Sequence, residues 1–231
     1  MKYRVEMKHL VKKSDFMILE NRLKKVMQQD KHIKNGNSYN VRSVYFDTYD
    51  NDYFYKKRNG INSRFKIRIR IYDKSDKLIK LEIKYKKDSY IKKDVSLISK
   101  EICEKLISGS FLSIDECKND KVLYKVYLEQ HLKNLRPKII VEYDRVAYTS
   151  SLGKTRVTFD SNIRASKKVE RFFLDDISSI PISVDNSLVL EVKYSEFIPD
   201  HIMQLMELNT LRQVSFSKYY LSRLKFNKEV L

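Results

Sequence analysis

Basic side chains at alternate positions mark the stretch FKIRIRIY, residues 65–72. Lys66, Arg68 and Arg70 alternate there with phenylalanine and isoleucine. Because successive side chains of a β-strand point to opposite faces, one face of this strand would carry three like charges, roughly 7 Å apart. Like charges at that spacing repel each other, so either water covers the face or an anion binds to it.

The same alternation of charged and apolar residues recurs in residues 3–9, 79–87, 155–160 and 188–194. An ordinary half-solvated sheet explains any one of these strands taken alone. Five such strands with few neutral polar residues favour instead a curled sheet whose charged faces line an interior. The charged faces hold nine cations and four anions, which are Lys8, Lys66, Arg68, Arg70, Lys80, Lys84, Lys86, Arg156 and Lys193, and Glu6, Glu82, Asp160 and Glu191.

A charged interior of this kind predicts an anionic ligand, because unpaired cations in a confined space are costly. A chain of phosphates would neutralise them, and arginine offers bidentate hydrogen bonds to phosphate oxygens. The few carboxylates suit a hard divalent cation, Mn²⁺ or Mg²⁺, that bridges phosphate oxygens. Lysine, arginine and glutamate on one face are therefore typical of metal-assisted phosphoryl transfer.

The composition agrees with a folded protein that binds polyanions. The chain has 231 residues, 42% of them hydrophobic, and a formal net charge of +17. No apolar run approaches the ~20 residues of a membrane helix, and no secretion signal is present, so we expect no membrane span and a cytoplasmic protein. Two reduced cysteines, Cys103 and Cys117, are expected in that compartment.

The order of the expected elements predicts an α+β fold with an antiparallel sheet in a single domain over residues 1–231. Amphipathic helices would cover the apolar outer faces of the curled sheet. The expected strands span residues 2–9, 39–48, 62–72, 78–87, 90–98, 138–149, 154–163 and 187–195. The expected helices span residues 14–29, 50–60 and much of 99–134, with two more that begin near Pro199 and Ser217.

Eight short motifs in order resemble those of the VTC domain, the polyphosphate polymerase domain of the vacuolar transporter chaperone complex and its bacterial relatives. That family belongs to the triphosphate tunnel metalloenzymes. The resemblance implies a closed antiparallel eight-stranded β-tunnel with helices packed on the outside, and transfer of the terminal phosphate of ATP to a growing polyphosphate chain with a divalent metal. The motifs are VEMKH (5–9), VRSVYFDT (41–48), RFKIRIR (64–70), LEIKYKK (81–87), EYDRVAY (142–148), RVTFD (156–160), LEVKY (190–194) and SFSKY (215–219).

The resemblance also implies roles for individual residues. Glu191 would hold the metal, with Glu6 and Glu82 as further candidates. Arg145 shares its strand face with Tyr143 rather than with its charged neighbours, so its assignment depends on the motif alone. The residues implied to grip phosphates are Lys8, Arg68, Arg70, Lys84, Arg145, Arg156 and Lys218, and alternation adds Arg42, Lys66, Lys86 and Lys193 as lumen residues that bind substrate.

Several functions remain open at this stage. No side chain is an obvious nucleophile, so catalysis would depend on positioning and electrostatics. The leading hypothesis is a polyphosphate polymerase that uses ATP or another nucleoside triphosphate and polyphosphate. The alternatives are a metal-dependent hydrolase of inorganic or nucleoside triphosphate, and a non-catalytic polyphosphate-binding module. Nucleic acid is not expected as a partner, because no recognised nucleic-acid motif is present.

Overall fold

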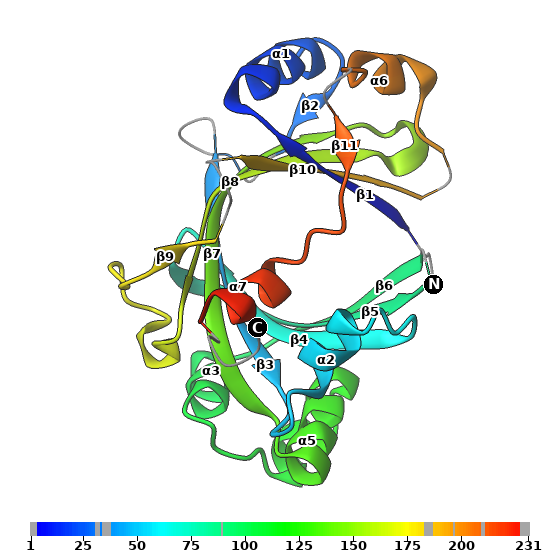
Figure 1. Ribbon diagram of the computed structural model, residues 1–231. Helices are drawn as coiled ribbons and strands as arrows, with labels where there is room; N and C mark the ends of the chain where they lie inside the picture. The colour runs from blue at the N-terminus through cyan, green and yellow to red at the C-terminus, as the bar shows by residue number, and fades with distance from the viewer. Residues whose placement is uncertain are drawn as a thin grey trace.

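Eleven strands and seven α-helices form the part of the chain described by the computed structural model, which is residues 4–30, 33, 38–88, 90–182, 187–195, 197–208 and 211–226. Figure 1 shows a curved sheet with helices at both ends of the molecule. The strands are β1 (Val5–Val11), β2 (Gln28–Gln29), β3 (Tyr39–Asp47), β4 (Arg64–Tyr72), β5 (Ser75–Lys87), β6 (Tyr90–Leu97), β7 (Arg136–Thr149), β8 (Arg156–Ser166), β9 (Ile180–Pro181), β10 (Leu188–Tyr194) and β11 (Arg212–Gln213). The helices are α1 (Lys13–Leu23), α2 (Asp52–Arg58), α3 (Lys100–Ile107), α4 (Ile114–Cys117), α5 (Lys121–Lys133), α6 (Asp200–Leu205) and α7 (Lys218–Phe226).

Eight longer strands make up the curved sheet in the order β1-β10-β8-β7-β3-β4-β5-β6, and all neighbours are antiparallel. The two end strands, β1 and β6, approach each other at one isolated bridge between Arg4 and Ile91. Their backbone N–H groups each donate to the other residue's carbonyl at 3.3 Å. The predicted α+β class with a large antiparallel sheet is confirmed.

Closure of the eight-stranded tunnel is not confirmed, because no ladder of hydrogen bonds joins β1 to β6 over the described residues. The structure offers a physical reason. The second edge of β1 pairs with β11 at His9 and Leu10, and the Val214 N–H donates to the Lys8 carbonyl at 2.8 Å. Those backbone groups of β1 are therefore already used, and a ladder to β6 cannot extend along them.

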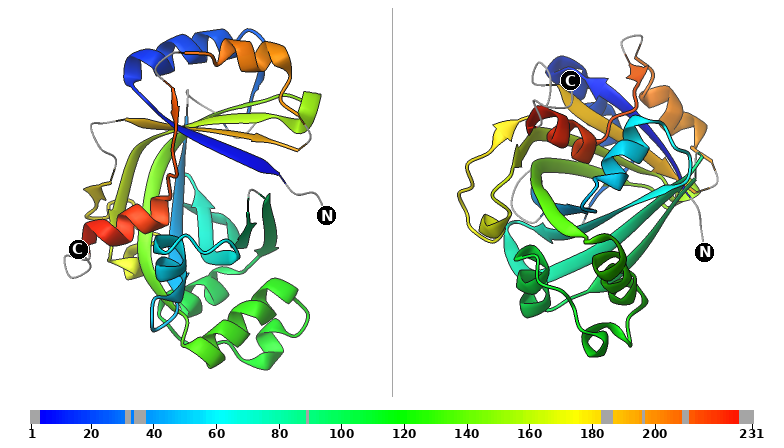
Figure 2. Two further views of the ribbon diagram at one scale, coloured as in Figure 1. Left: turned by 45° about the vertical axis from the view of Figure 1, so that its right-hand side comes forward. Right: turned by 60° about the horizontal axis from the view of Figure 1, so that its bottom comes forward.

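Helices cover the convex face of the sheet, as alternation predicts. At one end, α3, α4 and α5 contribute Leu106, Cys117 and Val126 to a core with the isoleucines of β4. At the other end, α1 and α6 contribute Leu19 and Ile202 to a core with the outer residues of β8 and β10. Figure 2 shows these two helical layers at opposite ends of the molecule, both outside the curve of the sheet. The apolar members of each alternating strand are therefore buried outside the sheet's curve.

Helix α7 does not follow the prediction that the helices pack on the outside. It packs on the concave face, where Tyr219 is buried against Val141 and Tyr45 of the sheet. The aromatic rings of Tyr45 and Tyr219 stack with centroids 5.3 Å apart. This part of the concave face is apolar, so it can bury a helix, and α7 thereby fills one half of the interior.

Candidate functional site

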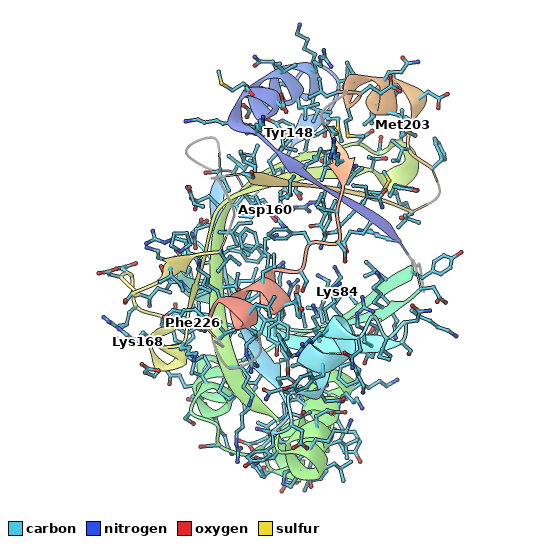
Figure 3. The ribbon with its side chains drawn as sticks, in the orientation of Figure 1. Lys84, Tyr148, Asp160, Lys168, Met203 and Phe226 are labelled. Carbon is cyan, nitrogen blue, oxygen red and sulfur yellow. The ribbon has the colours of Figure 1, made fainter. Side chains whose placement is uncertain are left out.

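A cavity of about 570 Å³ occupies the other half of the concave face. We call it the basic cavity, because eleven basic and two acidic side chains line it. In Figure 3, Lys84 of β5 and Asp160 of β8 lie on opposite walls of the interior. Eleven of the fourteen predicted site residues line this cavity, which are Glu6, Lys8, Lys66, Arg68, Arg70, Lys84, Lys86, Arg145, Glu191, Lys193 and Lys218.

The register of the sheet explains why residues so far apart in sequence meet there. Residues directly opposite each other on antiparallel strands point to the same face. Lys66 lies opposite Lys84, and Arg68 lies opposite Glu82, so the charged faces of β4 and β5 coincide. On the other wall, Lys8 lies opposite Glu191 in the same way. The predicted charged faces therefore all belong to the concave side.

The prediction that Arg42 is a lumen residue is corrected by its position. The Arg42 side chain is fully buried on the convex side and does not line the cavity. Its Nε donates to Glu142 at 2.7 Å, and its Nη1 donates to the carbonyls of Phe172 at 2.9 Å and Leu174 at 2.5 Å. Arg42 thus anchors the segment after β8 to the outside of the sheet.

Glu82 lies beneath the cavity rather than on its surface. Its side chain is 0% exposed and pairs with Arg68 at 2.6 Å and Lys93 at 2.8 Å. Burial alone would raise the pKa of Glu82, but Arg68, Arg70 and Lys93 outweigh it and hold this pKa far below its usual range. Glu82 is therefore a buried anion that orients Arg68, and these partners occupy both of its carboxylate oxygens.

Arg156 shares the concave face but lies beyond the basic cavity. Its Nη2 contacts Asp30 at 2.6 Å and donates to the Tyr39 hydroxyl at 3.0 Å. Its side chain is not part of the cavity lining. The structure therefore separates Arg156 from the other predicted phosphate-gripping residues.

Arg145 lines the cavity even though alternation places it with apolar residues of its own strand. Tyr143 and Arg145 both face inward, because this face of β7 is the concave one and the acidic neighbours point outward. Asp160 of β8 accepts hydrogen bonds from Arg145 at 2.6 and 2.8 Å and from Lys218 at 2.5 Å. Asp160 thus holds two of the cavity's cations in fixed positions, a function that the sequence motifs did not indicate.

Burial and the crowding of cations lower the pKa of several lysines that line the basic cavity. Burial, together with Lys8, Arg64, Lys57 and Arg68, lowers the pKa of Lys66 to about 7. Burial lowers the pKa of Lys8 to about 8 although Glu6 opposes the effect. Since the protonated forms are disfavoured without an anion, an anionic ligand would be bound with uptake of protons.

Burial and Arg145 also lower the pKa of Lys193 to about 8, again against the effect of Glu6. The pKa of Lys84 is lowered well below its usual value by burial, with Lys8 and Lys193 adding to the shift. Glu6 accepts hydrogen bonds from Lys84 at 2.8 and 3.0 Å. Glu6 therefore contacts lysines of both walls, Lys84 of β5 and Lys193 of β10, and Glu191 is the other carboxylate that contacts Lys193.

The segment that leads from β11 into α7 crosses the cavity and also lines it. Three lysines of the cavity donate to this segment: Lys8 to the Phe216 carbonyl at 3.0 Å, Lys57 to Ser215 Oγ at 2.8 Å and Lys66 to Ser217 Oγ at 2.7 Å. These neutral acceptors satisfy the lysines' hydrogen bonds without neutralising their charge.

Some lining residues were missed by the sequence-based prediction. Arg64 has the same parity as Lys66 on β4, so alternation extended by one residue could have found it. Lys57 lies at the end of α2, where no strand period applies. Tyr45 and Tyr143 also line the cavity and are uncharged. Their hydroxyls accept hydrogen bonds from Arg68 and Arg70, respectively, both at 3.0 Å.

Two carboxylates line the cavity, and they would hold a divalent metal only if a bound ligand supplied further oxygen atoms. Over the described residues, no group of three or more His, Cys, Asp or Glu side chains lies close enough to hold a metal. Glu191 and Glu6 face the cavity, and Lys193 contacts them at 3.1 and 3.4 Å. The Oγ of Thr158, the cross-strand neighbour of Glu191, is buried without a hydrogen-bond partner. Mg²⁺ is commonly bound by one or two carboxylates together with phosphate oxygens, so Glu191 and Glu6 fit a site of this kind.

Comparisons with known proteins identify the family and the fold. The family model described as the VTC domain matches residues 3–227. A Hippeastrum protein, assigned as an adenylyl cyclase and described as revealing a dominant triphosphatase activity, has a similar structure with a TM-score of 0.59 and 14% identity, and the match covers 97% of this chain and 96% of that one. An adenylate cyclase-like protein from Bacillus halodurans gives a TM-score of 0.47 and 15% identity over 88% and 86% of the two chains.

No curated protein matches the chain significantly. None of the helices in the described residues has the length and apolar character that crossing a membrane requires.

Proposed function

Because the chain belongs to the VTC domain family, we propose that it is a polyphosphate polymerase. The reaction transfers the terminal phosphate of ATP or another nucleoside triphosphate to an inorganic polyphosphate chain in the basic cavity. A divalent metal, Mn²⁺ or Mg²⁺, assists the transfer. A single domain over residues 1–231 and a cytoplasmic location remain predictions.

The excess of cations over carboxylates in the cavity is the observation that carries this proposal. Eleven basic side chains face two acidic ones, and two buried carboxylates beside the lining, Asp160 and Glu82, reduce the excess to about seven. A single phosphate carries at most about two negative charges near neutral pH, so one triphosphate group does not balance this excess. A nucleoside triphosphate and a polyphosphate chain bound together would supply the missing charge, and a polymerase must bind both at once.

The proposed transfer breaks the bond between the γ-phosphorus and the oxygen that bridges it to the β-phosphate. A terminal oxygen of the polyphosphate chain forms a new bond to the same phosphorus, and the nucleoside diphosphate leaves. Arg68, Arg70, Arg145 and Lys218 would hold the transferred group through bonds that their fixed positions already favour. No protein nucleophile is needed, so the site contributes alignment and positive charge.

Glu191, with Glu6 and Thr158 beside it, would hold the metal. Bound there, the metal would neutralise charge on the phosphate oxygens and fix their orientation. Lys193 would then exchange its contact with Glu191 for a contact with phosphate.

Hydrolysis of a triphosphate is the second candidate, and it differs only in the attacking group. The observation that favours it is the fold shared with the Hippeastrum protein described as a triphosphatase. Water would then replace the polyphosphate oxygen as the nucleophile. A module that binds polyphosphate without catalysis would retain the same cations and show no turnover.

Incubation of the purified chain with ATP and Mn²⁺ tests the proposal directly. A polymerase yields ADP and long-chain polyphosphate that is visible on a gel, and inorganic triphosphate added as a primer should shorten any lag. Orthophosphate as the sole phosphate product would identify a hydrolase instead. Tight binding of polyphosphate with neither product would identify a binding module.

A further inference from the structure

A second cavity of about 440 Å³ lies at the rim of the basic cavity. We call it the rim cavity. Four aromatic residues line it, Tyr53, Phe65, Tyr85 and Tyr90, together with five basic residues. No role for it follows from the phosphate chemistry described above, because phosphates do not need aromatic walls.

The rim cavity is continuous with the basic cavity. Arg64, Phe65 and Lys86 line both of them. Arg64 and Lys86 are cross-strand partners at the end of β4 and β5, and they share the concave face with Lys66 and Lys84. Phe65 and Tyr85, one position away on each strand, point to the opposite face. A molecule that spans this strand end would therefore meet two cations first and aromatic rings next.

The aromatic walls form a connected surface. The ring centroids of Tyr53 and Phe65 are 4.8 Å apart, and those of Phe65 and Tyr85 are 5.8 Å apart. Lys92 Nζ lies 5.2 Å from the centroid of the Tyr85 ring. The side chain of Tyr53 is fully buried and its hydroxyl donates to Glu129 at 2.8 Å, so Tyr53 supports Phe65 from behind, and the rings that a ligand can reach are those of Tyr85 and Tyr90. Lys125 Nζ covers the Phe65 ring in the same way, at 5.2 Å, so a planar heterocycle would stack on Tyr85 by displacing the Lys92 side chain from its ring.

We propose that the rim cavity binds the base and ribose of the nucleoside triphosphate. The phosphates of the same molecule would extend around the strand end, past Arg64 and Lys86, into the basic cavity. This inference depends on the proposed function, because it assigns the position of the donor nucleotide. It also gives the transfer a direction: the nucleoside diphosphate leaves through the rim, and the polyphosphate chain extends on the far side of the transferred phosphate.

The walls predict little discrimination between bases. Stacking on aromatic rings tolerates every base because each has a π-face, and larger rings gain more contact. Purine nucleotides should therefore bind more tightly than pyrimidine nucleotides, while ATP and GTP should bind within a few-fold of each other.

A comparison of ATP with inorganic triphosphate tests the inference. Isothermal titration calorimetry would measure both affinities for the wild type, for Tyr85→Ser and for Tyr85→Phe. Stacking is worth ~1–3 kcal/mol per base, so Tyr85→Ser should weaken ATP binding by about fivefold or more. The same substitution should leave the affinity for inorganic triphosphate within twofold, and Tyr85→Phe should retain both affinities because the ring remains.

The outcomes separate this inference from the proposed function. Equal losses for ATP and inorganic triphosphate in Tyr85→Ser would overturn the rim cavity as a nucleoside site, as would no loss for either. Wild-type protein that binds inorganic triphosphate and polyphosphate but not ATP would also overturn it, while the basic cavity would remain a phosphate site. Failure of the wild type to bind any of the three would remove the proposed function itself.

Discussion

The concave face of the sheet has two halves of opposite character. In one half, α7 and the apolar residues of β3, β7 and β8 pack together, and residues such as Val141 and Ile163 are fully buried. In the other half, cations line a cavity, and burial and mutual repulsion lower the pKa values of Lys66 and Lys8 to about 7 and 8. One strand face thus changes from a core to a binding surface along its length.

The difference shows how folding and binding are divided within one sheet. Burial of apolar groups in the first half favours the folded state. Confinement of cations in the second half opposes it, unless an anion is present. The stability of the rest of the molecule therefore maintains the basic cavity, and an anionic ligand would reduce the repulsion among its cations. Substitutions in the two halves should have opposite consequences.

The largest expected effect is a loss of stability, caused by a substitution that leaves a void in the apolar half. Ile163→Ala removes a fully buried side chain and should lower the free energy of unfolding by about 2–5 kcal/mol. Urea denaturation would measure it, with Leu174→Ala as a control at a residue that is 50% exposed. Affinity for inorganic triphosphate should stay within threefold at a temperature where both variants are folded. A large loss of affinity would contradict the division into two halves.

The next largest effect is a loss of catalysis, caused by a substitution in the basic cavity. Glu191→Gln keeps the shape of the side chain but removes the charge that would hold the metal, so turnover of ATP should fall about 100-fold or more. The free energy of unfolding should change little by comparison. Glu170→Gln, at an exposed residue outside the cavity, is the matched control. Wild-type turnover in Glu191→Gln would refute the metal assignment.

A smaller effect should have the opposite sign to that of Ile163→Ala. Lys66→Met removes a cation that burial and four basic neighbours disfavour. The ligand-free protein should gain about 0.5–2 kcal/mol in stability, while its affinity for polyphosphate falls. Thermal denaturation with and without polyphosphate would measure both changes. A loss of stability in the ligand-free variant would show that the crowding of cations does not destabilise the cavity.

The last expected effect is a dependence on pH, which needs no substitution in either half. The folded-state pKa values of Lys66, Lys8 and Lys193 lie at about 7, 8 and 8, below the unfolded value of about 10.4. Between these values the unfolded chain binds more protons, so the stability of the ligand-free protein due to these groups should rise with pH. Thermal denaturation from pH 6.5 to 9 would detect this rise, and Lys66→Met should reduce it.

Ligand binding should show the reverse trend over the same range. An anion favours the protonated lysines, so the affinity for inorganic triphosphate should fall by about three- to tenfold between pH 7 and 9. Calorimetry at constant ionic strength, in buffers of different ionisation enthalpy, would show uptake of protons on binding. Proton release over this range would contradict the lowered pKa values.

Much of the site could be predicted where the strands alternate cleanly. Lys66, Arg68 and Arg70 were found because a period of two identifies a face without any tertiary information. Arg42 was misplaced because β3 is buried on both faces, which makes its charged and apolar positions ambiguous. Lys57 was missed because it approaches the cavity from a helix, where the strand period does not apply.

The sequence by itself determined which residues share a face and, through its motifs, to which family the chain belongs. The shared faces and the family motifs both depend only on residues that are close together in the sequence. Only the tertiary structure decided that, over the described residues, no ladder closes the sheet and β11 occupies an edge of β1. It also decided which cations meet: Lys8 reaches the Phe216 carbonyl 208 positions away, and Asp160 joins Arg145 to Lys218. Burial and repulsion among such distant groups set their pKa values, and no local pattern encodes those distances.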